Sequence, residues 1–154
     1  MANPSNEEIV RRYLAAHEQH DGATMAELRA PEWTGEMPQS GELIRGHANE
    51  RAIMANWPGG RPEAQVGGHV VGSEDHWVLT PSWTYQRVNG QGDAWWADAV
   101  ARYPDGSTWH AVILLQLHGG KVIREVWYFA PPLEAPAWRS QWVERIPTEP
   151  SPER

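Results

Sequence analysis

The chain contains no cysteine in its 154 residues. This absence excludes disulfide bonds, thiolate metal ligands and cysteine nucleophiles. Positive charge is also scarce, because 13 Lys and Arg face 20 Asp and Glu and leave a formal net charge of −7. A surface of that sign argues against a nucleic-acid backbone or an anionic membrane surface as the partner.

Long apolar runs are missing as well. No stretch approaches the roughly 20 apolar residues of a membrane span, and the polar start MANPSNEEIVRR lacks the apolar core of a signal peptide. We therefore expect a soluble, cytoplasmic protein. The sequence also has no G-x-S-x-G, no glycine-rich phosphate loop and no H-E-x-x-H, the motifs of nucleophilic hydrolases, nucleotide-binding proteins and zinc proteases. His17 and His20 are spaced like two metal ligands, but no third ligand is evident, so we expect neither a metal nor another cofactor.

Aromatic residues are unevenly divided, with a single Phe against ten Trp. Tryptophan offers a large, flat apolar surface and one N–H donor. Packing in the core or at an interface is the ordinary role of any one Trp. Several of them around one cavity would instead suit a bulky, flat, apolar ligand.

The length fits a single domain over residues 1–146, and the Pro-rich, charged residues 147–154 are expected to form a disordered tail. Three helices are predicted near the start. The first spans residues 5–20 and begins with a capping box, S-x-x-E, ahead of an apolar stripe. A short helix ending at Pro31 and a third helix over residues 46–57 follow.

Strands dominate the rest of the chain. They are predicted at residues 33–36, 65–71 and 76–88, and in a three-strand meander at residues 94–103, 107–117 and 121–130. Beyond the meander, Trp138 and Trp142 lie on a common side of one or two helical turns. Helices followed by a long antiparallel sheet define an α+β domain.

The meander strands are apolar on both faces, which a sheet tolerates only when both faces are covered. A few ionisable side chains interrupt them, and burying such groups is costly unless they have partners. Each is therefore either paired locally or kept for chemistry; they are Asp98, Arg102, His110, Arg124 and Glu125.

Turn chemistry decides which of these residues share a face. A three-residue loop with Pro104 at its second position pairs Val100 with His110 and places Asp98 opposite Val112. A two-residue loop centred on Asp105 and Gly106 would move Asp98 to the opposite face, because a slip of one residue inverts the alternation. We prefer the first register.

The second turn carries two glycines, and a two-residue loop at Gly119 and Gly120 pairs His118 with Lys121. This register places His110 opposite Phe129, Val112 opposite Trp127 and Leu114 opposite Glu125. A three-residue loop would present Arg124, Val126 and Tyr128 on that face instead.

Under the preferred registers the two faces differ. One would line a cavity roofed by the helices: Trp96, Asp98, Val100, His110, Val112, Leu114, Glu125, Trp127 and Phe129. The other is almost entirely apolar, with Arg124 as its main polar residue: Ala97, Ala99, Trp109, Ala111, Ile113, Leu115, Leu117, Val126 and Tyr128. The sequence holds too little helix to cover both faces, so we predict a homodimer through this outer sheet face.

Three segments resemble the SnoaL-like, nuclear-transport-factor-2-like superfamily, which includes ketosteroid isomerases, scytalone dehydratase and limonene-epoxide hydrolase. They are VRRYLAAHEQHDGATMAEL, GELIRGHANERAI and LHGGKVIREVWYFAPP, and the resemblance covers residues 6–132. It implies a conical α+β fold in which a strongly bent sheet wraps around a long helix and leaves a deep apolar pocket. It also implies a dimer through the sheet.

The functional residues of these enzymes match the chain only in part. Tyr13 matches the tyrosine that ketosteroid isomerases use as an oxyanion donor, whereas their catalytic base falls near Met37 and their protonated aspartate near Ile113. Asp98 matches the first aspartate of the epoxide hydrolases. Their arginine and last aspartate are replaced by Trp96 and Trp127. His110, Asp98 and Tyr13 imitate the scytalone dehydratase set loosely.

Asp98 is the main candidate for proton transfer, because desolvation raises the pKa of a carboxyl group toward neutrality. The alternative is a strand-end carboxylate paired with Arg102 or Arg124. His110 is the candidate partner, or a hydrogen-bonded core histidine. Tyr13 is the candidate donor to a developing oxyanion, or an ordinary core residue.

The remaining candidates bind ligand. Glu125 either orients His110 or binds a ligand; the alternative is a salt bridge with Arg102 or Arg124. The other predicted pocket residues are Trp33, Trp96, Leu114, Trp127 and Phe129. Together these residues favour a cofactor-free lyase, isomerase or cyclase acting by general acid–base catalysis on an apolar, aromatic or polycyclic substrate. The alternative is a non-catalytic protein that binds an aromatic ligand in a Trp-lined pocket.

Overall fold

The computed structural model describes residues 4–56, 82–102 and 108–146. The strand expected at residues 65–71, part of that expected at 76–88, the turn around Pro104 and the tail at 147–154 lie outside the described residues. Within them, no helix is long and apolar enough to cross a bilayer.

The N-terminal helices form where the sequence predicts them. Helix α1 spans Asn6–Glu18 and starts at Ser5, whose hydroxyl accepts from the Glu8 backbone N–H while the Glu8 carboxylate accepts from the Ser5 N–H. Helix α2 spans Gly22–Leu28 and is capped by the Asp21 side chain. These local bonds fix both helix starts, because the first N–H groups of a helix lack intrahelical partners.

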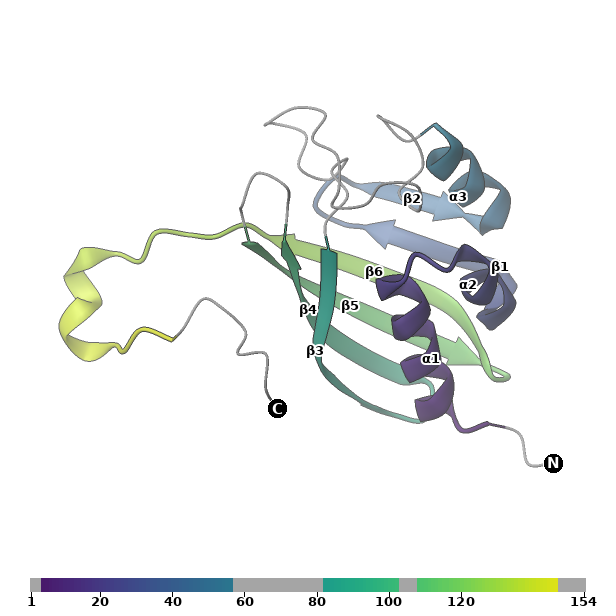
Figure 1. Cartoon of the computed structure of the whole chain (residues 1–154), viewed down its shortest axis with the longest axis horizontal. Helices are drawn as coiled ribbons and strands as arrows, with labels where there is room; N and C mark the ends of the chain where they lie inside the picture. Colours follow the sequence, from purple (N-terminus) through teal and green to yellow (C-terminus); the bar gives the residue numbers. More distant parts are fainter. Residues whose placement is uncertain (1–3, 57–81, 103–107, 147–154) are drawn as a thin grey trace.

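One six-stranded mixed sheet follows, in the order β2-β1-β6-β5-β4-β3 (Figure 1). Strand β1 pairs parallel with β6, and every other neighbouring pair is antiparallel. The elements after α2 are β1 (Arg29–Met37), β2 (Glu42–Arg45), α3 (Gly46–Ala55), β3 (Ser82–Gln91), β4 (Ala94–Arg102), β5 (Thr108–His118), β6 (Lys121–Ala130) and the 3₁₀ helix η3 (Ala137–Trp142). The α+β class is confirmed, and β2 is a strand that the sequence analysis missed.

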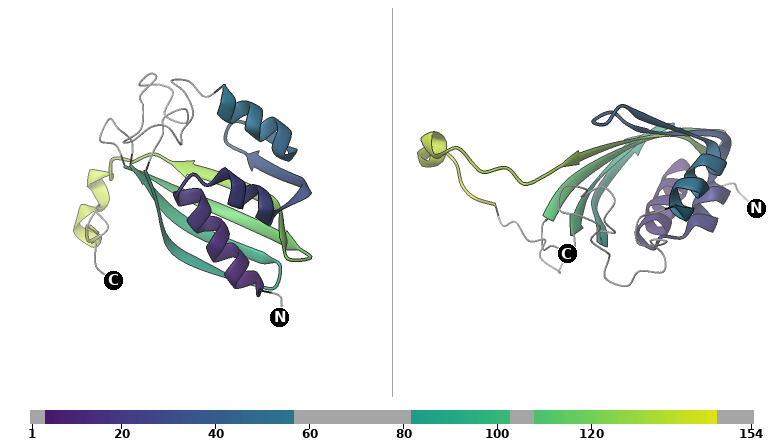
Figure 2. Two further views of the ribbon diagram at one scale, coloured as in Figure 1. Left: turned by 45° about the vertical axis from the view of Figure 1, so that its right-hand side comes forward. Right: turned by 90° about the horizontal axis from the view of Figure 1, so that it is seen from above.

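The sheet is curved but not closed, and α1 and α2 lie within its concave side (Figure 2). The core forms there, where the apolar stripe of α1 meets the inner side chains of β4, β5 and β6. Its fully buried members include Val10, Tyr13, Trp33, Ile113 and Leu117.

The register expected at the first meander turn is confirmed, because Val100 pairs with His110 and Asp98 with Val112. At the second turn, Gly119 and Gly120 both have positive φ, as a two-residue loop requires, and His118 pairs with Lys121 as expected.

A β-bulge then shifts the second register by one residue. Leu117 pairs with Val122 while Gln116 pairs with Arg124, so Ile123 is the extra residue. The expected pairing of Leu114 with Glu125 is therefore wrong, and Leu114 lies opposite Val126. Beyond the bulge, every β6 side chain is on the opposite face from the one expected.

The expected roles of the two faces are also wrong. The helices cover the face that carries Ala97, Ala99, Ala111, Ile113, Leu115 and Leu117, all of which are buried. Glu125, Trp127 and Phe129 join this inner face because Leu115, Ile113 and Ala111 are their partners on β5.

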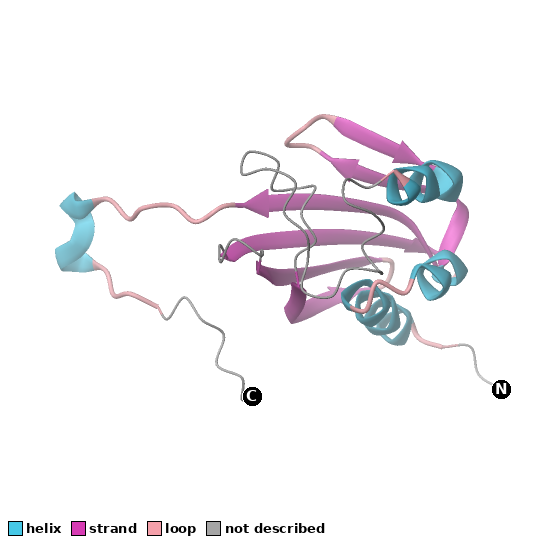
Figure 3. Ribbon diagram, turned by 45° about the horizontal axis from the view of Figure 1, so that its top comes forward, coloured by secondary structure: helices cyan, strands magenta, loops and turns pink. Residues whose placement is uncertain are grey.

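The outer face is the mixed one. His110, Val112, Leu114, Gln116, Arg124 and Tyr128 are exposed on it, whereas Val100 and Val126 are buried. After β6 the chain continues as residues 131–146, which extend away from the sheet and include η3 (Figure 3). The predicted helical turns at Trp138 and Trp142 are present there as 3₁₀ helix.

Candidate functional site

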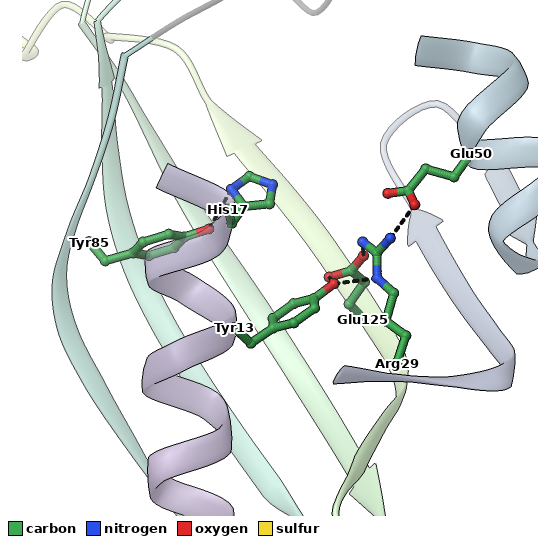
Figure 4. Close-up of polar contacts among 6 residues, drawn as sticks. All are labelled: Tyr13, His17, Arg29, Glu50, Tyr85 and Glu125. Atoms are coloured by element: carbon green, nitrogen blue, oxygen red, sulfur yellow. Dashed lines mark hydrogen bonds and ion pairs between the residues drawn. The ribbon is translucent and has the colours of Figure 1, made fainter. Parts of the chain in front are cut away.

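A cluster of ionisable side chains is buried between α1 and the inner face of the sheet (Figure 4). At its centre the Tyr13 hydroxyl donates to Glu125 Oε2 over 2.8 Å and accepts from Arg29 Nε over 2.6 Å. Arg29 Nη2 donates to Glu125 Oε1 over 2.7 Å. The three side chains thus close a ring of hydrogen bonds although they come from α1, β1 and β6.

Arg29 is held from several sides. It is the first residue of β1 and the C-cap of α2, and its side chain is 1% exposed. Its guanidinium lies 3.8 Å from the centre of the Trp33 ring, a cation–π geometry. Nη1 forms an ion pair with Glu50 of α3. A buried cation needs such compensation, since removing it from water is costly.

Among the described residues, Glu125 is the only Asp or Glu that is buried. Its residue is 3% exposed, and burial raises its pKa above the ordinary value, although Arg29 and the Tyr13 hydrogen bond lower it in part. Burial also raises the pKa of Tyr13, which keeps the phenol neutral. Ion pairing with Glu125 opposes the burial of Arg29 and raises the pKa of the guanidinium, which therefore stays charged.

A second polar pair lies one helical turn further along α1. His17 Nδ1 and the Tyr85 hydroxyl are 3.1 Å apart, and the His17 ring lies 4.7 Å from the Trp127 ring centre. Burial lowers the pKa of His17 to about 3, so the imidazole is neutral at neutral pH. Trp127 in turn stacks on Phe129, with ring centres 5.9 Å apart.

The repeats of the helix and the strand explain why the contact of Tyr13 with Glu125 and that of His17 with Trp127 lie next to each other. Tyr13 and His17 are four residues apart on one face of α1, whereas Glu125 and Trp127 are two apart on one face of β6. Both spacings advance by about 6 Å. Tyr13 therefore meets Glu125 and His17 meets Trp127.

The structure brings together only part of the predicted site. Five predicted residues line the interior, namely Tyr13, Trp33, Glu125, Trp127 and Phe129. The other four are on the outer face, namely Trp96, Asp98, His110 and Leu114. The expected meeting of Asp98 and His110 with Tyr13 does not occur, because the sheet lies between them.

Asp98 forms an ion pair on the outer face. Its Oδ2 accepts from Arg87 Nη2 over 2.6 Å, and its side chain is 18% exposed. Pairing with an arginine was the alternative considered for this residue, but the partner is Arg87 rather than Arg102 or Arg124. Asp98 Oδ1 has no hydrogen-bond partner among the described residues. His110 is exposed.

Sequence reasoning missed Arg29, Glu50 and the interior position of His17. Arg29 follows the apolar Met25 and Leu28 of α2, but a cation at a helix C-terminus is ordinary, so the local sequence gives no signal that this one is buried. His17 lies four residues after Tyr13, which places it on the same helix face. The salt bridge expected for Glu125 exists, but its partner is Arg29.

Comparison with known proteins agrees with this architecture. A family model described as a SnoaL-like domain matches residues 10–125, most of the chain. The chain belongs to this family. None of the curated proteins matches it.

Several solved structures are similar to this family member. An NTF-2 like protein of unknown function from Burkholderia xenovorans LB400 is 28% identical, with a TM-score of 0.69 over 92% of this chain and 95% of that one. A Kribbella flavida DSM 17836 protein provisionally assigned as a ketosteroid isomerase is 21% identical, with a TM-score of 0.70 over 94% and 91%. TerC, co-crystallised with polyporic acid, is 18% identical, with a TM-score of 0.60 over 80% and 90%. The last two likenesses support the fold alone.

Proposed function

We propose that this SnoaL-like protein is a cofactor-free enzyme of the lyase, isomerase or cyclase type. It acts by general acid–base catalysis on a small, largely apolar, aromatic substrate. The observation that carries the proposal is the buried carboxylate of Glu125, whose raised pKa and interior position suit proton transfer near neutral pH.

Each interior group has a part in this chemistry. Glu125 exchanges a proton with the substrate, and Arg29 and Tyr13 hold its carboxylate in place. The same cation and phenol stabilise negative charge that develops on a substrate oxygen. His17 is a neutral imidazole beside Trp127, and with its pKa lowered to about 3 it serves as a hydrogen-bonding group for the substrate and not as a proton carrier.

The aromatic side chains favour the proposed substrate class. Trp127 and Phe129 form a stacked pair on the inner face, next to Glu125 in the sequence of β6. Flat π surfaces bind flat apolar ligands by stacking. Polyporic acid, the compound crystallised with TerC, is consistent with such a ligand in a protein of this fold.

One observation favours the alternative, a non-catalytic pocket protein. The Tyr13 hydroxyl already donates to Glu125 and accepts from Arg29, and each Glu125 oxygen accepts a hydrogen bond within the chain. In a pure binder this cluster would brace the wall of the pocket. In an enzyme, substrate must replace at least one of these bonds.

Proton abstraction can be tested without knowledge of the natural substrate. We expect the protein to accelerate exchange of the α-protons of 2-tetralone, a flat aromatic ketone, in D₂O, measured by loss of the proton signal in NMR. Glu125→Gln should remove this acceleration while leaving the binding of 2-naphthol, measured by Trp fluorescence quenching, within about threefold of the wild type.

One further variant tests where the chemistry takes place. The Asp98→Asn variant should accelerate the exchange of the 2-tetralone α-protons as much as the wild type does, because Asp98 is on the outer face and paired with Arg87. Loss of exchange in Asp98→Asn but not in Glu125→Gln would contradict the interior site. Binding of 2-naphthol with no exchange above the buffer rate would favour the pocket protein.

A further inference from the structure

Glu50 of α3 is the second carboxylate bound to Arg29. Arg29 Nη1 donates to Glu50 Oε2, while Nη2 donates to Glu125 Oε1 over 2.7 Å. The remaining nitrogen, Nε, donates to the Tyr13 hydroxyl. The guanidinium lies between the two carboxylates, which approach it from α3 and from β6 (Figure 4). One buried cation therefore serves two anions.

A second contact of α3 holds Glu50 against Arg29. His47 and Glu50 are three residues apart, on one face of the helix. The His47 ring stacks on Trp33, with ring centres 5.9 Å apart, and Trp33 itself packs on the Arg29 guanidinium. The Glu50 side chain is accordingly well shielded, with 19% of its surface exposed.

The cluster holds more negative than positive charge. When both carboxylates are ionised, the single charge of Arg29 faces the two charges of Glu50 and Glu125, so one negative charge is in excess. Excess charge away from water is costly, and the uptake of one proton by a carboxylate removes it. The cluster therefore has a place for one proton.

The neighbouring side chains of the described part of the chain do not supply the missing positive charge. The titratable groups of the elements packed around Arg29 and Glu125 are Tyr13 and His17 of α1, His47 of α3 and Tyr85 of β3. Burial raises the pKa of both tyrosines and lowers the pKa of His17 to about 3. Burial also lowers the pKa of His47. These groups are neutral at neutral pH, and the positive charge beside the two carboxylates is that of Arg29.

Different exposure favours Glu125 over Glu50 as the place for this proton. Glu50 is the more exposed of the two, and a negative charge costs less where water can reach it. Burial is the main cause of the raised pKa of Glu125, and the charge of Glu50 raises it further, against the opposing effects of Arg29 and of the Tyr13 hydrogen bond. Glu50 thus acts on Glu125 in the same direction as burial does.

We propose that Glu50 and Glu125 share one proton across Arg29, and that Glu50 thereby keeps Glu125 able to accept and release a proton near neutral pH. Glu50 is a positioning residue in this scheme, because it acts through Arg29 and does not touch the substrate. Paired with Arg29 alone, Glu125 would belong to a balanced ion pair and would be a much weaker base. The catalytic use of this proton rests on the proposed function, whereas the sharing itself does not.

A carbon-13 NMR titration of the wild-type carboxyl groups tests the sharing without a substrate. Two groups that share a proton titrate as a coupled pair, so each one reports the protonation of the other. We expect the δ-carbon signal of Glu50 to show a step at the midpoint of the Glu125 titration. A Glu50 signal without a step at that pH would overturn the proposal.

The variant Glu50→Gln tests the direction of the effect. It removes a negative charge and leaves Arg29 to Glu125 alone, so the midpoint of the Glu125 titration should move down by about one pH unit. Glu27→Gln is the matched control, because it breaks an ion pair with Arg12 at the surface, and its Glu125 midpoint should equal that of the wild type. An unmoved midpoint in Glu50→Gln would contradict the sharing.

The pH profile of 2-tetralone exchange links the shared proton to the chemistry. In Glu50→Gln the profile should move to lower pH together with the NMR midpoint, and the rate at its plateau should fall roughly threefold, because a weaker base removes a proton more slowly. Glu50→Asp keeps the charge and should keep the profile close to that of the wild type. A lower rate with an unmoved profile would show that Glu50 only supports the fold.

The two proposals fail in different ways. A wild type without exchange but with a Glu125 midpoint that moves in Glu50→Gln would contradict the enzymatic function and support the shared proton. Exchange in the wild type with the same Glu125 midpoint in Glu50→Gln would overturn the shared proton and leave the enzymatic function in place.

Discussion

The side chain of Arg29 links two helices and two strands through direct contacts. Its guanidinium bonds to Tyr13 of α1, Glu50 of α3 and Glu125 of β6, and it stacks on Trp33 of its own strand. A cation buried to this degree is tolerated only because every direction around it is compensated. The same arrangement makes its two carboxylate partners depend on it.

Replacement of Arg29 should therefore be far more damaging than replacement of a surface arginine. We expect Arg29→Met to lower the free energy of unfolding by about 3 to 5 kcal/mol, because Glu125 is left as a buried, uncompensated charge. Arg124→Met is the matched control, since its ion pair with Glu36 is on the surface and contributes about 1 kcal/mol or less. Urea unfolding of both variants measures the difference, and equal losses would contradict the role assigned to Arg29.

His17 should give stability a distinct pH dependence. The unfolded chain protonates this histidine near pH 6.5, whereas the folded chain keeps it neutral down to about pH 3. Between these values the unfolded state binds more protons, so stability is lost as the pH falls through this window. We expect His17→Gln to remove about 3 kcal/mol of the loss between pH 6.5 and pH 4. Parallel curves of unfolding free energy against pH for the two proteins would show that His17 contributes nothing.

Individual residues were predictable where one element sets their position. Tyr13 is on the apolar stripe of α1 and faces the interior, as its helical spacing indicates. Arg29 was missed because its partners are as many as 96 residues away in the sequence, and no local pattern reports such a distance. The interior placement expected for Asp98 and His110 failed because alternation defines two faces without saying which one the helices cover.

Among the elements, β6 shows how a single extra residue in a strand changes which face of the sheet its side chains are on. The glycine pair at 119 and 120 predicts its turn correctly, and the bulge at Ile123 then reverses the face of every later side chain. Without it, Glu125 would point away from Arg29 and Tyr13. No turn residue in the sequence signals a bulge at this position, so the register could be predicted at the turn but not beyond it.

The hairpin of β3 and β4 contains two glycines, and a different structural constraint favours glycine at each position. A Cβ at Gly90 would lie 2.5 Å from the Ala94 carbonyl oxygen and 2.7 Å from the Trp95 Cα, so a methyl group forces backbone atoms apart. Gly92 has open space around it but a φ of +56°. We expect Gly90→Ala to cost about 3 kcal/mol and Gly92→Ala about 1 kcal/mol. Thermal unfolding orders the two, and a larger loss for Gly92→Ala would contradict the steric account.

For the whole molecule, element order was enough to predict an α+β domain, and the resemblance of three segments predicted the SnoaL-like family; the structure and the family match confirm both. The resemblance supplied the fold because its segments set the order of the elements. It could not supply the parallel pairing of β1 with β6, which joins the two ends of the fold.

That parallel pairing has a consequence for the chain as it is being made. Arg29 leaves the ribosome 96 residues before Glu125, the more distant of its two carboxylate partners, an interval of about 5 to 20 seconds at ordinary rates of translation. Throughout that time β1 has no β6 to pair with, and the hydrogen bonds from Arg29 to Glu125 cannot form. The domain can therefore close only after nearly all of it has been synthesised.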